Sequence, residues 1–251
     1  MNASIPLLLL SLLLLTHQEV PTDQGTPASD KQAPASEEKT DTSAIAPAIS
    51  LLGKDHPPMV LADTTGKIFD LATLSDKIVV LEWTQPDCRF TRRLYAQHRI
   101  IPMIRRWGKQ DVKWVSVNST FYSHPEKVKP WHEKYPIQHP YLLDQKGTVA
   151  EAFGVKTCPT YLVLNRGKIV YHGAIDDDVW GRNTERKLYL DEAIRLTVEG
   201  LEVENPLTRT YGMQIRTRRL EDIRRAALEK ARAEVQVPKP PKSPDTGGDR
   251  R

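Results

Sequence analysis

One stretch, residues 78–88, constrains the fold of this chain more than any other. It reads Ile-Val-Val-Leu-Glu-Trp-Thr-Gln-Pro-Asp-Cys, and its nearly continuous apolar half predicts a central strand that is covered on both faces. Pro86 and Asp87 end the strand, and Cys88 then opens a helical stretch. The only other cysteine is Cys158, which immediately precedes Pro159. The first cysteine thus lies between a strand and a helix, and the second lies just before a later strand. This order predicts that both cysteines meet at one place.

Residues 51–201 alternate between strand-like and helix-like runs, and about 150 residues are enough for one ordinary domain. The predicted elements are a hairpin at 59–71, strands at 78–83, 112–117, 141–143, 160–164 and 169–172, and helices at 88–106, 125–135, 148–153 and 183–199. Pro102 predicts a kink or a break in the first helix. This order indicates an α/β protein with the thioredoxin fold, a central mixed sheet flanked by helices.

The first fifty residues are expected to lie outside this domain. Residues 1–16 contain an apolar run that is too short to span a bilayer comfortably and is typical of a secretory signal peptide. An uncleaved N-terminal anchor is the alternative. Residues 17–50 are rich in Pro, Ser, Thr and Ala, a composition that favours a disordered tether. We therefore expect an exported protein, periplasmic or extracellular, which stays tethered to the membrane if the anchor is retained.

The basic character of the chain comes from its tail, residues 202–251. From Pro206 onward there are twelve Lys and Arg against six Asp and Glu, whereas the whole chain carries a net charge of only +4. The charge therefore gives no reason to expect nucleic-acid binding by the domain. Residues 218–236 have high helix propensity and a narrow apolar stripe, which indicates either a solvated helix or a basic amphipathic helix that contacts a membrane surface or a partner. The Pro- and Lys-rich end that follows is expected to be disordered.

The position of Cys88 predicts a reactive thiol. Unpaired N–H groups at a helix N-terminus stabilise a thiolate, and Arg89, Arg92 and Arg93 add positive charge nearby. A buried structural cysteine is the alternative. Cys158 is either the resolving thiol or a small packing residue, and a disulfide between the two cysteines would require Cα atoms within about 7 Å of each other.

The residues expected to line the substrate site flank the two cysteines. They are Trp83, Gln85, Pro86, Arg92, Pro159 and Thr160. We expect neither a metal nor a cofactor. Asp176, Asp177 and Asp178 are adjacent acids on an extended segment without a completing histidine, so a solvated loop or a helix cap is favoured there.

Four motifs in this order carry a resemblance to a known family. They are Leu81–Tyr95, Leu142–Gly147, Gly154–Pro159 and Tyr171–Asp178. Over about residues 53–200 the chain resembles thioredoxin-like redoxin-domain proteins, mostly exported bacterial proteins, which are related to the alkyl hydroperoxide reductase / thiol-specific antioxidant family. The resemblance implies a thioredoxin fold and thiol-based redox chemistry at the two cysteines.

The chain departs from that family at positions that matter for chemistry. Gln85 stands three residues before Cys88, where thioredoxins have a second cysteine and peroxiredoxins have a threonine. The position after Tyr211-Gly212 is often a cysteine in similar proteins and is Met213 here. A local Cys-x-x-Cys pair is therefore excluded, and Cys158 is the only internal partner for Cys88.

These observations favour a thiol oxidoreductase in which Cys88 is the nucleophile and Cys158 resolves it. The expected partner is a protein or a small thiol or disulfide, with an electron donor that the sequence does not identify. One alternative is a redox-inactive binding or adaptor module. Another is a one-cysteine peroxidase-like protein.

Overall fold

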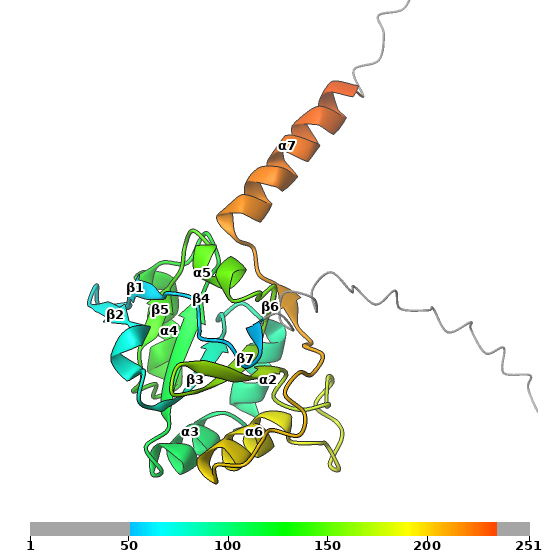
Figure 1. Ribbon diagram of the computed structural model, residues 1–251. Helices are drawn as coiled ribbons and strands as arrows, with labels where there is room; N and C mark the ends of the chain where they lie inside the picture. The colour runs from blue at the N-terminus through cyan, green and yellow to red at the C-terminus, as the bar shows by residue number, and fades with distance from the viewer. Residues whose placement is uncertain (1–50, 235–251) are drawn as a thin grey trace, which may run out of the picture. The chain divides into compact units, whose positions relative to one another are not determined.

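The computed structural model describes residues 51–234, which include the predicted domain and most of the basic tail (Figure 1). The expected signal peptide at 1–16, the tether at 17–50 and the Pro- and Lys-rich end lie outside the described residues. Within residues 51–234, no helix combines the length and the apolar character needed to cross a bilayer.

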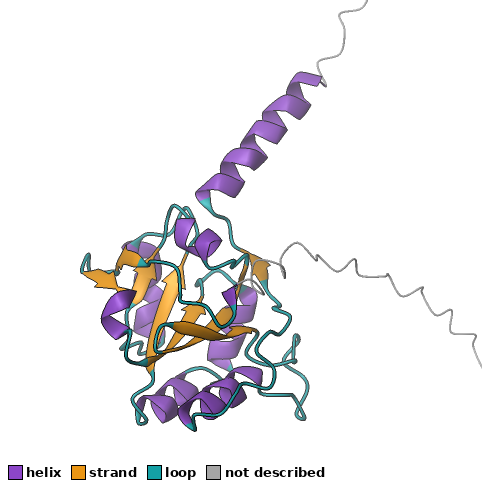
Figure 2. Cartoon of the chain, viewed as in Figure 1, coloured by secondary structure: helices purple, strands orange, loops and turns teal. Residues whose placement is uncertain are grey.

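A five-stranded mixed sheet forms the centre of the domain (Figure 2). Its order is β5-β4-β3-β7-β8, with β3 (Ile78–Trp83) in the middle. The strands β4 (Lys113–Asn118) and β5 (Tyr141–Leu143) run parallel to β3, whereas β7 (Thr160–Asn165) and β8 (Lys168–Gly173) form an antiparallel hairpin beside it. The thioredoxin fold predicted from the order of elements is therefore confirmed.

Helices cover both faces of this sheet. Successive side chains of β3 point to opposite faces, so its apolar side chains must be buried on both sides. Val80 packs in a cluster that includes Leu94 and Ile194, while Val79 and Leu81 pack in a second cluster that includes Phe153. The helical elements are η1 (Leu71–Leu74), α2 (Arg89–Ala96), α3 (Ile101–Gly108), α4 (Pro125–Lys134), α5 (Thr148–Ala152), α6 (Tyr189–Val198) and α7 (Arg218–Glu234).

One helix prediction is confirmed by the structure and another is corrected. The helical stretch predicted over 88–106 is broken into α2 and α3, as Pro102 indicates, and Pro102 lies in the first turn of α3, where its missing N–H costs no hydrogen bond. The helix predicted from residue 183 begins only at Tyr189. Residues before it are held in a loop, since the Lys187 N–H donates to the Asp177 carboxylate at 2.9 Å.

Two small sheets stand beside the central one. The predicted hairpin is present as β1 (Val60–Ala62) and β2 (Ile68–Asp70). The second small sheet was not predicted, and it pairs β6 (Thr157–Cys158) with β9 (Met213–Gln214) in antiparallel register. It joins the residues around Cys158 to the beginning of the basic tail.

The predicted domain boundary after Leu201 lies before the last residues that pack in the hydrophobic core. Val203 and Ile215 are buried in the two hydrophobic clusters, so the chain remains part of the domain well beyond that boundary. In α7, by contrast, no side chain is buried, and its largest apolar side chains, Leu220, Ile223 and Leu228, are exposed. Contact of this helix with a membrane surface or a partner stays a prediction.

Candidate functional site

Cys88 occupies the N-cap position of α2, directly after the turn that ends β3. The turn is closed by the Cys88 N–H, which donates to the Gln85 carbonyl at 3.1 Å. Before it, the Thr84 N–H donates to the Val117 carbonyl at 2.9 Å, which extends the β3–β4 pairing to the start of the turn. The side chain of Cys88 is completely buried. The strand-to-helix transition therefore fixes the sulfur just beyond the C-terminal end of the central strand β3.

The structure brings the second cysteine to the same place. Cys158 ends β6, the Cys158–Pro159 peptide bond is cis, and β7 begins at Thr160 beside β3. The Cys88 thiol donates to the carbonyl oxygen of Cys158, with Sγ and O 3.1 Å apart. Both cysteines are free thiols, and 1% of Cys158 is exposed. Residues seventy positions apart thus form one buried thiol pair.

The two thiols differ in acidity. A hydrogen bond from the Cys158 side chain is the largest cause that lowers the pKa of Cys88, to about 6; burial opposes it. The N–H groups of Thr91 and Met213 also stabilise the thiolate, as does the Thr91 hydroxyl, which has no other hydrogen-bond partner among the described residues. The same hydrogen bond, together with burial, raises the pKa of Cys158 well above its usual range. Cys88 is therefore the more acidic thiol of the pair and the one that ionises first.

The arginines of α2 contribute to the site differently from what the sequence predicts. Arg92 is exposed, and Arg89 lies over the ring of Phe90, with its guanidinium carbon 4.8 Å from the ring centre. Arg93 donates to the carbonyl oxygens of Asp178 and Val179. Hydrogen bonds, first that from the Cys158 side chain and then those from Thr91 and Met213, rather than these cations, lower the pKa of Cys88.

The other expected substrate residues fall into two groups. Trp83, Pro159 and Thr160 are buried: the Trp83 indole donates to Ser119, and the Thr160 hydroxyl donates to the Thr157 carbonyl at 2.8 Å. Gln85 and Pro86 instead line a polar hollow of about 190 Å³. The Gln85 side chain is 4% exposed, and its Oε1 has no hydrogen-bond partner among residues 51–234. Of the expected substrate residues, Gln85 and Pro86 are therefore the two that line this hollow, whose lining includes neither cysteine.

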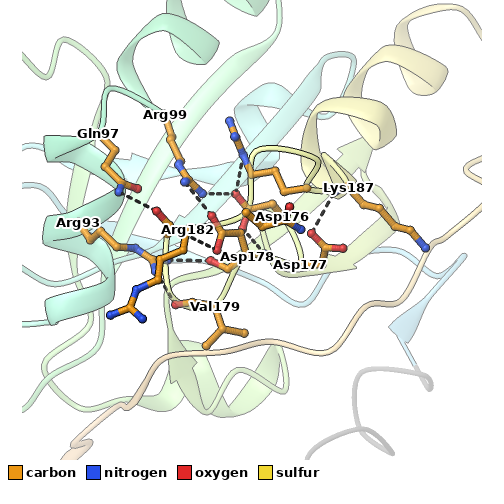
Figure 3. Close-up of polar contacts among 12 residues, drawn as sticks. Arg93, Gln97, Arg99, Asp176, Asp177, Asp178, Val179, Arg182 and Lys187 are labelled. Carbon is orange, nitrogen blue, oxygen red and sulfur yellow. Dashed lines mark hydrogen bonds and ion pairs between the residues drawn. The ribbon is translucent and has the colours of Figure 1, made fainter. Parts of the chain in front are cut away.

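The acidic run is a buried ion cluster, and the predicted solvated loop is wrong for two of its three acids (Figure 3). Asp176 and Asp178 are 1% and 4% exposed, whereas Asp177 is exposed. Arg99 bridges them with contacts of 2.8 Å to Asp176 and 2.9 Å to Asp178. The Tyr211 hydroxyl donates to Asp176 at 2.6 Å. The cluster therefore connects the 176–187 loop to the segment that pairs with Cys158.

Glu82 is a polar residue of β3 that the sequence analysis did not single out. It is completely buried, and its Oε2 accepts hydrogen bonds from Tyr95 and Trp114 at 3.0 Å and from Ser116 at 3.2 Å. Burial raises the pKa of this carboxyl. The signal that could have revealed it is one acid inside an otherwise apolar strand.

Replacing Glu82 with glutamine should flatten the pH dependence of stability. A carboxyl whose pKa is higher in the folded state stabilises the fold most below its unfolded pKa, and this contribution is lost as pH rises through the folded pKa. Glutamine keeps the acceptor for Tyr95 and Trp114 without acquiring charge. Urea unfolding at pH 5 and pH 8 should show a smaller loss of stability in Glu82→Gln than in the wild type. An equal loss in both proteins would contradict the role assigned to Glu82.

Among residues 51–234, no cluster of three His, Cys, Asp or Glu side chains has an arrangement that could hold a metal ion. The reactive groups that the site does contain are the two thiols, Cys88 and Cys158. A low-pKa thiolate beside a protonated thiol can attack a disulfide sulfur, form a mixed disulfide and be released by the second thiol.

Comparison with known proteins identifies a family model and a curated protein that this chain resembles. Residues 52–172 match the model of the AhpC/TSA family. The thiol-disulfide oxidoreductase ResA of Bacillus subtilis (strain 168) is 29% identical over 119 residues, which cover 47% of this chain and 64% of ResA. The matched region thus spans less than two thirds of that relative.

Two solved structures share the fold over most of their length. A hypothetical protein from Sinorhizobium meliloti 1021 matches with a TM-score of 0.59 and 23% identity, over 66% of this chain and 94% of that chain. An uncharacterized conserved protein from Geobacillus kaustophilus matches with a TM-score of 0.58 and 26% identity, over 65% and 90% of the two chains. These similarities support the fold assigned from the order of strands and helices.

Proposed function

We propose that this chain exchanges thiols for disulfides through Cys88 and Cys158, since residues 52–172 match the AhpC/TSA family model and the chain is similar in sequence to a thiol-disulfide oxidoreductase. The observation that carries the proposal is the buried pair itself, with Cys88 Sγ at the N-terminus of α2 and 3.1 Å from the Cys158 carbonyl. A protein or small-molecule disulfide is the proposed substrate.

The proposed reaction transfers two electrons from the pair to a substrate disulfide. The Cys88 thiolate attacks one substrate sulfur, forms a mixed disulfide and expels the other sulfur as a thiolate, which takes up a proton. Cys158 then loses its proton and attacks the Cys88 sulfur, which releases the second substrate thiolate and leaves a Cys88–Cys158 disulfide. An external dithiol donor reduces that disulfide and completes the cycle.

The two cysteines would have distinct roles in this cycle. Hydrogen bonds from Cys158, Thr91 and Met213 support Cys88 as the attacking group because they stabilise its thiolate. The high pKa of Cys158 keeps its proton in place until the mixed disulfide has formed, when the Cys88 thiolate that raised this pKa no longer exists. This order of events prevents both sulfurs from being charged together in a buried site.

The hydrogen bond from Cys158 can be tested through the pH profile of Cys88 alkylation. In Cys158→Ser, which keeps a donor, the rate should rise with a midpoint near pH 6, the pKa of Cys88. In Cys158→Ala, which removes the donor, the midpoint should move upward toward the unperturbed value of about 8.5. Both variants contain a single cysteine, so iodoacetamide labelling followed by mass spectrometry reports Cys88 alone. Equal midpoints in the two variants would contradict the coupling.

The binding-module alternative is favoured by one observation, the burial of both cysteines, with exposures of 0% and 1%. A redox-inactive module would bind its partner equally well when both cysteines are serine. A thiol oxidoreductase would require Cys88. Comparing the wild type with the double serine variant therefore distinguishes the two proposals.

Export to the periplasm or the extracellular space remains our proposal for the localisation, supported by the apolar run within residues 1–16.

A further inference from the structure

The segment 211–217 crosses directly over the thiol pair. Met213 lies opposite Cys158 and Gln214 opposite Thr157 in the antiparallel β6–β9 ladder. The crossing continues with two more backbone hydrogen bonds, from Ile215 N–H to the Lys156 carbonyl and from Phe121 N–H to the Arg216 carbonyl, both 2.9 Å. The edge of β6 next to Cys158 is thereby occupied by the protein's own chain.

Gly212 is where this segment comes closest to the site. A Cβ atom added at this position would lie 2.0 Å from the carbonyl oxygen of Cys158, the same oxygen that the Cys88 thiol contacts. The backbone of Gly212 also has φ +154°, which disfavours a side chain. Only glycine allows the segment to lie against the Cys158 carbonyl.

The segment is held mainly at its two ends. At one end the Tyr211 hydroxyl donates to the buried Asp176 at 2.6 Å. At the other end Ile215 is 2% exposed and packs in the hydrophobic cluster with Phe153. Between them, Met213 and Gln214 are exposed, and the ladder is only two residues long. Such a short strand pair contributes little stability of its own.

We propose that residues 211–217 form a displaceable strap that closes the thiol pair, and that the strap must leave the edge of β6 before Cys88 can attack a disulfide. This inference rests on the proposed function, because an attacking sulfur must come into contact with the substrate sulfur, and Cys88 is completely buried in the closed form. Displacement frees the backbone of Thr157 and Cys158 together with both sulfurs. The observed rate of thiol-disulfide exchange is therefore the rate of the open form multiplied by the fraction of molecules in which the strap is open.

Alkylation of Cys88 in the reduced full-length protein tests the strap at pH 8.5 without invoking any substrate. Two variants should open it: Tyr211→Phe removes the bond to Asp176, and Gly212→Ala places a methyl group against the Cys158 carbonyl. We expect Cys88 labelling by iodoacetamide to accelerate several-fold in Tyr211→Phe and at least about tenfold in Gly212→Ala. Peptide mass spectrometry identifies the labelled cysteine.

Matched controls separate opening of the strap from general loosening. Tyr189→Phe makes the same deletion on α6, and Gly200→Ala introduces a methyl group at φ +73° where no atom lies within 4 Å. Both controls should label at the wild-type rate. Urea unfolding of each variant verifies that it is folded under the labelling conditions.

Two results would overturn the strap: wild-type Cys88 labelling as fast as in guanidinium-unfolded protein, or equal rates in the wild type and both strap variants. The disulfide assay keeps the two proposals apart. Fast labelling without any disulfide reduction in Gly212→Ala would refute the proposed function and leave the strap intact. Disulfide reduction at the same rate in the wild type and both strap variants would refute the strap and leave the function intact.

Discussion

Replacing Arg99 with methionine is expected to lower the free energy of unfolding by about 3–5 kcal/mol, the cost of removing one partner from a buried ion pair. The guanidinium bridges Asp176 and Asp178 at 2.8 and 2.9 Å, and both carboxylates are almost completely buried. Without Arg99, Asp178 loses its ion-pair partner, while Asp176 keeps a 3.3 Å contact with Arg186. Methionine preserves much of the apolar stem of the arginine side chain. The measured loss in the free energy of unfolding therefore reports the removal of the positive charge.

The destabilisation by Arg99→Met should depend on pH in a defined direction. Burial raises the pKa of Asp178, but its hydrogen bonds, above all that from Arg99, outweigh burial and lower this pKa to about 2. A carboxylate with a depressed folded pKa stabilises the fold above its unfolded pKa, about 3.9, and the contribution disappears as pH falls toward 2. The difference between wild type and variant should therefore shrink between about pH 4 and pH 2.

The control for this experiment is Arg105→Met, which removes an exposed arginine from α3. An exposed substitution of this kind is expected to change stability by no more than about 0.5 kcal/mol. Urea unfolding at pH 7 and at pH 3 measures both variants. A loss below about 1 kcal/mol in Arg99→Met at pH 7 would show that the cluster is not a main support of the 176–187 loop.

The parts of the fold that the sequence predicts are those with strong periodic or apolar patterns. The apolar run Ile78–Trp83 is unbroken except for Glu82, and the structure places it at the centre of the sheet. The start of α6 was misjudged because residues 183–188 have no feature that rules out a helix, whereas tertiary contacts such as that between Lys187 and Asp177 hold them in a loop. The β6–β9 pair was missed since two-residue strands are too short for any periodicity to appear.

The residues of the candidate site also fall into those that the sequence predicts and those that it does not. The sequence predicts that Cys88 begins a helix and that the Cys158–Pro159 segment precedes a strand, and the fold then brings the two together. It does not predict that Asp176 and Asp178 are buried, because the arginine that neutralises them lies 77 and 79 residues away. It also gives no indication that Gly212 lies on the Cys158 carbonyl, a contact that depends on long-range pairing alone.

Replacing Cys88 with serine is expected to abolish catalysed disulfide reduction, leaving only the rate measured without the protein. A serine hydroxyl at the N-cap of α2 accepts the same backbone hydrogen bonds but supplies no thiolate at neutral pH. The remaining Cys158 is a poor substitute, since it is buried, and burial by itself raises the pKa of its thiol even without Cys88. The assay follows turnover of a cystine-containing peptide with dithiothreitol as the electron donor, and the fold of the variant is verified by urea unfolding.

Cys158→Ser should fail at a different step, and this difference tests the order of the reaction. Cys88 can still attack the substrate, so the variant should accumulate about one equivalent of mixed disulfide per protein when the donor is omitted, detectable as a mass increase on Cys88. The wild type under the same conditions should instead form the internal Cys88–Cys158 disulfide and release both substrate thiols. Sustained turnover by Cys88→Ser, or a mixed disulfide on Cys158, would show that the two cysteines have been assigned in the wrong order.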